Sequence, residues 1–308
     1  MRSVLLFCLL LLTSVVATAQ FTYSSLVVDY DSAITYKNLK IIPIYRGGGG
    51  GNIPLVSLSY AMKKGWATIT ERGTASTENV HWVRINNTST HPIYVAGGEI
   101  LVGGRQDRMV TRDTILMPAG GADQYISVMC IEEDRWSEKE KKFSYFSYAN
   151  PSLRKILETT HNQVLIWKEI YGQLDSLKIP SPTLTYTSER SDKLLMQEMA
   201  QYRNYMDRVI SKRDSNWVGM IAVSGNRVLG LEAFLTKELF YQNSSYLLDA
   251  FIEEAVSFGS KLAKTDEEIA QYIDPALISE ASQQQYLKTH GKLTYYQLKP
   301  FRLTLFSQ

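Results

Sequence analysis

Cysteine and histidine are scarce in this chain of 308 residues, and their scarcity argues against several kinds of site. The chain has two cysteines and four histidines: Cys8, Cys130, His81, His91, His161 and His290. Their spacings match no zinc-binding motif and no cysteine–histidine nucleophile motif. We therefore expect no metal centre and no cofactor. Cys130 lies among alternating apolar residues, so we interpret it as a buried and inert packing residue.

A large excess of charge of either sign is also lacking. The chain carries 33 Lys and Arg residues against 31 Asp and Glu residues, a net charge of +2. Such a balance gives no general attraction to nucleic acid or to an anionic membrane surface. Beyond the N-terminus, no apolar run is long enough to cross a bilayer. We therefore expect no nucleic-acid partner and, after processing, no membrane span.

The N-terminus has the pattern of a secretion signal. Arg2 precedes an apolar run from Val4 to Val16, and the small residues Ala17-Thr18-Ala19 follow it. A basic start, a short apolar run and small residues before the cleavage point are typical of a removed signal peptide. The pattern predicts a signal peptide at 1–19 and an exported protein, periplasmic or secreted, that begins at Gln20. Cys130 is then the only cysteine left, which excludes an internal disulfide.

The remaining chain divides into stretches of different periodicity. An N-terminal leader at 20–35 precedes a β-rich stretch at 36–136, a helical stretch at 151–212, a hairpin with helices at 217–262 and strands at 292–306. Ser57 and Gly65 have the residue types of the N-cap and C′ positions around a short helix. Gly225-Asn226, between two apolar runs, indicates the turn of a β-hairpin.

Longer helices are predicted at about 152–177, 235–240 and 246–262. Another helix carries an apolar stripe with helical spacing, Leu195, Met199, Tyr202, Met206 and Val209, and we also expect Met196 in the core. Together these elements predict an α+β fold with one domain at 36–308. Its core is a β-sandwich or partly closed barrel that the late hairpin completes, with the helical segment packed on one face.

The most unusual stretch is Ala96–Asp113, with the sequence AGGEILVGGRQDRMVTRD. If its polar part is extended, Gln106, Arg108 and Arg112 share one face, and the arginines offer bidentate donors to a phosphate or carboxylate. The two glycine pairs would let backbone N–H groups approach such an anion closely. The alternative is structural, with both arginines in salt bridges to acids of the chain: Glu99, Glu132 or Asp134.

A second polar segment, CIEEDRW at Cys130–Trp136, lies just downstream. Unpaired buried charge is costly, so we expect the charges of the two segments to satisfy one another. Gly97–Asp113 is then predicted to form a glycine-turned corner whose polar groups gather with those of Glu132–Arg135. Trp136 is expected to pack, with Arg135 lying against it.

Several blocks of the chain resemble the motifs of one family. GGEILVGGRQDR resembles a G-E-x-L-x-G-A-K-Q-N-R signature, CIEEDRW resembles C-V-E-x-G-R-W, and VGMIAVSGNRVLGLEAF resembles a block in which a hairpin precedes a Phe. With NLKIIPI and SYAMKKGWATITE, they make the chain similar to the ARG-and-rhodanese-phosphatase-associated protein domain family over about Asn38–Val256. The resemblance implies a link to ADP-ribose or nucleotide metabolism, through neighbouring genes, without an established reaction.

The resemblance can be carried onto individual positions of this chain. The matching residues are Glu99, Gly103, Gln106, Arg108, Cys130, Glu132, Arg135 and Trp136. The chain departs from the signatures at Gly104, Arg105, Asp107 and Asp134, where the family pattern has Ala, Lys, Asn and Gly. Asp107 adds a charge where the pattern has a neutral amide, which argues against an identical ligand.

Two functions of different classes fit these residues. The first is an exported binding or scaffold domain that recognises an anionic small molecule, nucleotide-like or ADP-ribose-like, or an envelope protein. Its ligand-binding residues would be Gly103, Gly104, Gln106, Arg108, Arg112 and Arg135. The alternative is a hydrolase-like enzyme that acts on a nucleotide-sugar or phosphorylated substrate through the paired carboxylates of Glu99 and Glu132.

Overall fold

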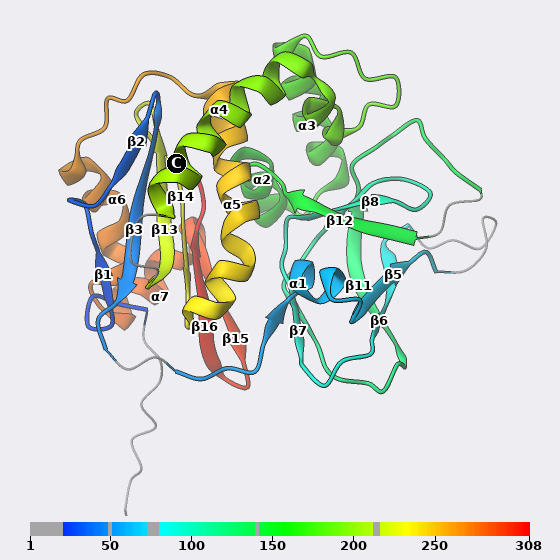
Figure 1. Cartoon of the computed structure of the whole chain (residues 1–308), viewed down its shortest axis with the longest axis horizontal. Helices are drawn as coiled ribbons and strands as arrows, with labels where there is room; N and C mark the ends of the chain where they lie inside the picture. The colour runs from blue at the N-terminus through cyan, green and yellow to red at the C-terminus, as the bar shows by residue number, and fades with distance from the viewer. Residues whose placement is uncertain (1–20, 49–50, 73–79, 139–141, 212–215) are drawn as a thin grey trace, which may run out of the picture.

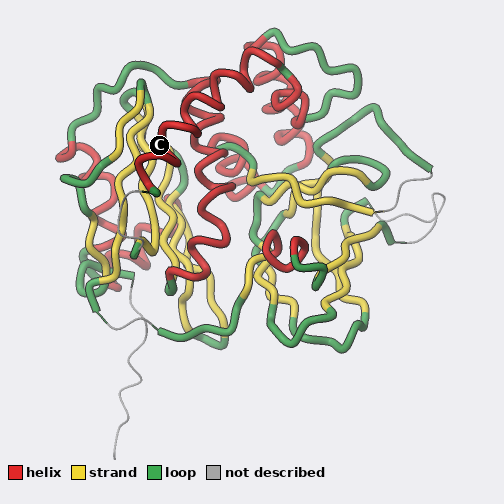
Figure 2. The backbone as a smooth tube through the Cα atoms, viewed as in Figure 1, coloured by secondary structure: helices red, strands yellow, loops and turns green. Residues whose placement is uncertain are grey.

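Two groups of β-strands, with helices between and around them, make up the structure (Figures 1 and 2). The computed structural model describes residues 21–48, 51–72, 80–138, 142–211 and 216–308. The predicted signal peptide at 1–19 lies outside the described residues. Helices and strands both contribute large parts of the described chain, which confirms the predicted α+β class.

The first group of strands is a closed barrel with the order β11–β6–β5–β12–β8–β9. Its strands are β5 (Ala67–Thr70), β6 (Trp82–Asn87), β8 (Glu99–Gly103), β9 (Arg108–Val110), β11 (Asp123–Cys130) and β12 (Lys142–Tyr148). Alternate side chains point inward, because side chains along a strand alternate between its two faces. Ile69, Val83, Leu101, Val110 and Ile126 are fully buried and pack together in one apolar cluster. The barrel alternative of the prediction is therefore confirmed.

A small sheet and a short helix adjoin the barrel. The sheet contains β4 (Val56–Ser57), β7 (Ile93–Val95) and β10 (Thr114–Leu116). Helix α1 (Leu58–Lys63) follows β4, and the Ser57 side chain accepts a hydrogen bond from the N–H of Tyr60 at 3.2 Å. Gly65 follows the helix with φ +71°, a conformation that glycine adopts without strain. Both predicted caps are confirmed.

The second group of strands is a seven-stranded sheet built from the two ends of the described chain. Its members are β1 (Leu26–Val28), β2 (Ile34–Tyr36), β3 (Leu39–Arg46), β13 (Trp217–Ser224), β14 (Arg227–Phe234), β15 (Gly291–Tyr296) and β16 (Lys299–Leu305). The predicted hairpin at Gly225-Asn226 is confirmed, because β13 pairs with β14. Its expected place was wrong: it does not complete the barrel but forms the centre of this sheet, between β3 and β16.

Helices cover both faces of the seven-stranded sheet. In the view of Figure 1, α4 (Lys193–Ile210) and α5 (Lys237–Phe258) lie in front of the sheet, and α6 (Asp266–Leu277) and α7 (Glu280–His290) lie behind it. Figure 2 shows α5 between the sheet and the barrel, and it contacts both. On α4, Met199, Tyr202 and Met206 are buried as predicted, whereas Met196 is 40% exposed, contrary to the prediction.

The predicted division into helices was wrong in two places. The helix expected at 152–177 is two helices, α2 (Pro151–Thr160) and α3 (Gln163–Leu177), because His161 adopts a left-handed conformation and Asn162 caps α3. The helices expected at 235–240 and 246–262 are one helix, α5. Asn243 stands inside it without interrupting it, since its amide donates to the Leu239 carbonyl and accepts from the Tyr148 hydroxyl.

In the part of the chain that the structure describes, no helix combines the length and the apolarity needed to cross a bilayer.

Candidate functional site

Two segments that are distant in sequence meet at one end of the barrel. They are Gly103–Arg108, where β8 turns into β9, and Glu132–Arg135, which follows β11; together we call them the motif corner. Gln106 Nε2 donates to the carbonyl oxygens of Glu132 and Glu133, both at 3.0 Å. The backbone N–H of Asp107 donates to Glu132 Oε2 at 3.0 Å. The predicted gathering of Gly97–Asp113 with Glu132–Arg135 is therefore confirmed for Gly103–Arg108 and not for the rest of the stretch.

Arg135 joins the two segments of the motif corner through charged contacts. Its Nε donates to Glu132 Oε2 at 2.8 Å, and its Nη2 donates to Asp107 Oδ1 at 3.1 Å. The other Asp107 oxygen accepts from the hydroxyls of Thr185 and Thr187 at 3.1 and 3.0 Å. Burial raises the pKa of Asp107 even with Arg135 beside it. These contacts hold the loop after β8 in one conformation.

Arg108 is fully buried at the same end of the barrel, and its acidic neighbour is Glu71. Arg108 Nη2 lies 3.7 Å from Glu71 Oε1, and Nη1 donates to the Gln106 carbonyl oxygen at 3.1 Å. Within the described residues, Arg108 Nε has no hydrogen-bond partner. The structural alternative named other acids for Arg108. Glu71 is missing from that prediction: its alternation with Ala67 and Ile69 indicates an inward position but does not show that Arg108 lies opposite.

Arg105, and not Arg135, lies against Trp136. The Arg105 guanidinium carbon is 5.6 Å from the centre of the Trp136 ring. Its Nη1 donates to the carbonyl oxygens of Ser137 and Glu138 at 3.0 and 3.2 Å. Trp136 remains 42% exposed, so the expectation that it packs was wrong. Arg105 itself is 1% exposed and fixes this loop to the barrel end.

The second glycine pair of the stretch is required by packing. Gly103 and Gly104 have φ of +98° and +56°. A Cβ on Gly104 would lie 2.2 Å from the Phe143 ring and 2.8 Å from Glu71 Oε1. A Cβ on Gly103 would lie 2.8 Å from the Lys142 carbonyl oxygen. The close approach of β12 and Glu71 therefore explains both glycines without a ligand.

Cys130 ends β11 with 8% of its surface exposed, which confirms the predicted burial. Burial raises the pKa of its thiol, although Arg108 acts in the opposite direction. The Gln163 side chain accepts from the Cys130 N–H at 3.1 Å and donates to the Cys130 carbonyl oxygen at 2.6 Å. These two bonds fix the backbone at Cys130, and its buried thiol with a raised pKa has the environment of an inert packing residue.

Glu99 and Arg112 do not join the motif corner. Glu99 is fully buried, and its carboxyl accepts hydrogen bonds from the N–H of Ala96 at 2.9 Å and from the Tyr145 hydroxyl at 3.1 Å. Burial raises the pKa of Glu99 to about 8. Arg112 is exposed on the loop between β9 and β10. Glu99 and Glu132 share no hydrogen-bond partner among the described residues.

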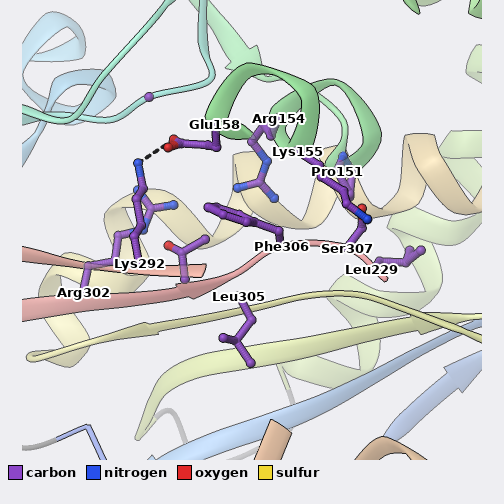
Figure 3. Close-up of a pocket in the computed structure, with 12 residues that line it drawn as sticks. Pro151, Arg154, Lys155, Glu158, Leu229, Lys292, Arg302, Leu305, Phe306 and Ser307 are labelled. Carbon is purple, nitrogen blue, oxygen red and sulfur yellow. Dashed lines mark hydrogen bonds and ion pairs between the residues drawn. The ribbon is translucent and has the colours of Figure 1, made fainter. Parts of the chain in front are cut away.

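The first glycine pair borders a second charged cluster, the crevice between α2 and the C-terminal strands (Figure 3). Figure 3 shows Lys292 of β15 pointing to Glu158 of α2, at 2.5 Å, and Lys292 also lies 3.0 Å from Asp113. A Cβ on Gly97 would lie 2.9 Å from Glu158 Oε1, and one on Gly98 would lie 2.8 Å from the Arg154 side chain. These glycines therefore let α2 approach the turn before β8.

Arg154 and Arg302 share one carboxylate beneath this crevice. Glu232 Oε1 accepts from Arg154 at 2.5 Å, and Glu232 Oε2 accepts from Arg302 Nη2 at 2.8 Å. Burial alone would raise the pKa of Glu232, but Arg302 and Arg154 outweigh it and lower the pKa. The crevice leaves a volume of about 10 Å³. That is room for about one water molecule, so the cluster acts as packing between α2 and the sheet.

A larger hollow lies at the start of α5, away from the residues that the sequence pattern indicates as a site. It has a volume of about 440 Å³ and is lined by Arg46, Gly48, Gly51, Asn216, Val218, Leu235, Thr236, Lys237 and Glu238. Thr236 caps the helix, which leaves other N–H groups of the first turn without intrahelical acceptors. Arg46 Nη2 donates to the Phe234 carbonyl oxygen at 3.2 Å, whereas its buried Nε has no partner among the described residues.

The electrostatics of this groove, which we call the α5 groove, favour an anion. Burial lowers the pKa of Arg46, because its charge is partly removed from water. Glu238 also lines the groove and supplies one negative charge against the two cations, Arg46 and Lys237. Lys237 Nζ contacts the neutral Asn216 amide oxygen at 3.3 Å. The positive end of a 22-residue helix dipole adds to these two cations. Sequence signals for the groove were weak, since Arg46 and Lys237 are far apart in the chain.

The fold and these sites define an α+β protein in which a closed barrel and a helix-covered sheet share one connecting helix. The family model for the ARG and Rhodanese-Phosphatase-superfamily-associated Protein domain matches residues 27–299, so the chain belongs to this family. No match was found among curated proteins or among solved structures.

Proposed function

We propose that the chain is an exported binding domain for an anionic small molecule, and that the α5 groove holds this ligand. The observation that carries the proposal is that Arg46, Lys237 and the cap residue Thr236 at the start of α5 line one hollow of about 440 Å³. Helix N-termini bind phosphate and carboxylate groups through free N–H groups and the helix dipole. Export rests on the predicted signal peptide at 1–19.

The volume of the α5 groove and the family to which the chain belongs both indicate the class of anion. Pockets of roughly 300–1,000 Å³ are typical for small ligands of nucleotide size. Two cations and one helix N-terminus outweigh the single carboxylate of Glu238 and suit a phosphate group, whose oxygens can accept from both cations. The family link to ADP-ribose or nucleotide metabolism supports the same class. We therefore propose a nucleotide-like or ADP-ribose-like ligand whose phosphates lie between Arg46 and Lys237.

The motif corner is a weaker location for such a ligand, because its charges already contact one another. Arg135 contacts the carboxylates of Asp107 and Glu132, and fully buried Arg108 lies 3.7 Å from that of Glu71. The Arg105 guanidinium donates to the carbonyl oxygens of Ser137 and Glu138. An added anion would have to displace one of these carboxylates, which would leave a buried charge without its partner. We propose that the motif corner fixes the barrel end and that binding occurs elsewhere.

The proposal is tested by titrating ADP-ribose, ADP and inorganic phosphate into the chain that starts at Gln20, followed by calorimetry. The double variant Arg46→Gln/Lys237→Gln should weaken ADP-ribose binding by at least about tenfold, since a charge-assisted hydrogen bond contributes about 1.5–3 kcal/mol. The matched control is Lys261→Gln, an exposed lysine beyond the opposite end of α5, and it should bind as the wild type does.

Two results would contradict the proposal. Binding that is unchanged in the double variant would remove the α5 groove as the site. Binding that is lost in folded Arg108→Gln but kept in the double variant would instead place the ligand at the motif corner, as the sequence alone predicted.

A further inference from the structure

A second hollow lies between α4, α5 and the seven-stranded sheet, and its lining is mostly apolar. Its volume is about 110 Å³, and its apolar wall includes Ile210, Trp217, Met220, Phe240 and Leu248. It shares no lining residue with the α5 groove. Four of these side chains are at most 4% exposed, so the wall belongs to the core and not to the outer surface.

The wall is fixed before any ligand arrives. Trp217 Nε1 donates to the Tyr45 hydroxyl at 3.0 Å, and the two rings meet edge to face. At the rim, Arg203 Nε donates to Asp207 at 2.8 Å, and Arg203 Nη1 donates to Asp249 at 2.8 Å. The bond to Asp207 lies within α4, whereas the bond to Asp249 joins α4 to α5 beside the hollow. A ligand would therefore enter a formed cavity and would not have to order its walls.

We infer that this hollow is a binding site for a small apolar ring, no larger than one six-membered aromatic ring. An apolar cavity of roughly 150 Å³ in another protein stays dry and binds benzene, so the volume found here sets a limit near one ring. Trp217 and Phe240 offer ring faces and edges, and Met220 offers a polarizable sulfur, all of which favour an aromatic guest. Ser244 and Asp207 at the rim would accept one polar substituent of that ring.

The size limit gives the site a selectivity that the α5 groove lacks. A fused two-ring molecule needs more volume than the hollow offers, so its second ring would remain at the exposed rim beside Tyr241. The close-packed core side of the hollow does not expand cheaply to admit that ring. Among the described lining residues the cation is Arg203, and it is bonded to two carboxylates, so a charged phosphate would gain little here. The two sites are thus expected to take different ligands, and the failure of one proposal would leave the other intact.

Thermal unfolding with benzene and with naphthalene tests the inference, using variants at Ser244. In the part of the chain that the structure describes, the Ser244 hydroxyl makes a single, long contact of 3.4 Å to the Tyr241 carbonyl oxygen, so its loss should disturb α5 little. Ser244→Ala keeps the hollow open, whereas Ser244→Leu fills it. Benzene should raise the melting temperature of the wild type and of Ser244→Ala in a concentration-dependent way. It should leave Ser244→Leu unshifted, and naphthalene should shift none of them.

Ile210→Phe fills the hollow from α4 and provides the same test if Ser244→Leu does not fold. The absence of a benzene shift in the wild type would overturn the inference. An equal benzene shift in a folded filled variant would also overturn it, because benzene would then bind elsewhere. A naphthalene shift as large as the benzene shift would contradict the one-ring limit.

Discussion

Glu99 is a carboxyl whose surroundings favour its protonated form. Burial raises its pKa to about 8, well above the value in an unfolded chain, so the folded state binds a proton that the unfolded state has released between about pH 4.5 and 8. Stability contributed by this group is therefore complete at low pH and falls as the pH rises toward 8, by at most about 1.4 kcal/mol per pH unit.

We predict that Glu99→Gln flattens this part of the pH dependence and makes the protein relatively more stable at pH 8. Glutamine is neutral, like the protonated acid. Its amide oxygen can still accept from the Ala96 N–H, and its NH2 group can donate to the Tyr145 hydroxyl. Denaturant unfolding at several pH values between 4.5 and 8 measures the slope. Glu280→Gln, at an exposed position, should keep the wild-type slope; the same slope in Glu99→Gln would refute the assignment.

In the motif corner, the sequence predicted that the charged residues pair with one another, but it did not predict every pairing correctly. The sequence indicated that the charges near Gln106 and Arg135 would satisfy one another, because burying them separately is costly. It did not indicate that Arg108 pairs with Glu71, since strand alternation shows which face a residue occupies but not which strand lies opposite. Trp136 was misjudged for a related reason: its neighbour Arg105 is held by carbonyl oxygens that only the folded loop supplies.

Helix α2 is positioned against the barrel through the first glycine pair. Gly98 has φ +87°, and its missing side chain leaves room for Arg154, which is 8% exposed and bonded to Glu232. We predict that Gly98→Ala destabilises the fold by about 1–3 kcal/mol, from backbone strain and from overpacking against Arg154. Equilibrium unfolding in urea measures this loss.

Gly172 provides the matched control at the level of an element. It stands in the middle of α3, is exposed, and would meet no atom within 4 Å if it carried a Cβ. Gly172→Ala should stabilise the protein by about 0.5–1 kcal/mol, because alanine favours the helix. If Gly98→Ala were as stable as the wild type, α2 would not depend on the close approach described here.

Helix boundaries were harder to predict than helix existence. The break between α2 and α3 occurs at His161-Asn162, which lacks the glycine or proline that usually signals an interruption. In the opposite direction, the Asn-Ser-Ser run in α5 suggests a break that tertiary contacts override, because Asn243 is fully buried and bonded to Tyr148. Propensity acts locally, and in both cases a partner from another element decides the outcome.

At the scale of the whole molecule, the sequence predicted the hairpin but not the sheet that contains it. Strands β13 and β14 are buried along almost their entire length, so their apolar runs fit the centre of any layer. The hairpin joins the sheet and not the barrel because β13 pairs with β3 and β14 pairs with β16. No pattern in a single strand indicates its partners over such distances.

Export is the other prediction at this scale. Expression of the full sequence with a bacterial secretion system should yield a chain that begins at Gln20, because the small residues Ala17-Thr18-Ala19 precede the expected cleavage point. Intact-mass spectrometry of the exported fraction measures the N-terminus. Replacing Ala17 and Ala19 by Asp should block cleavage, and an exported chain that retains Met1 in the unaltered protein would contradict the prediction.

The pairing of β3 with β13 has a consequence for the order in which the molecule can be assembled. Tyr45 and Trp217, which meet in this pairing, are 172 residues apart, whereas the strands of the barrel are neighbours in one stretch of chain. During synthesis the barrel is therefore complete while β3 still exposes an apolar edge with no partner. A chaperone that holds β3 until β13 emerges would raise the yield of folded protein, and a chain stalled before Trp217 would aggregate through that edge.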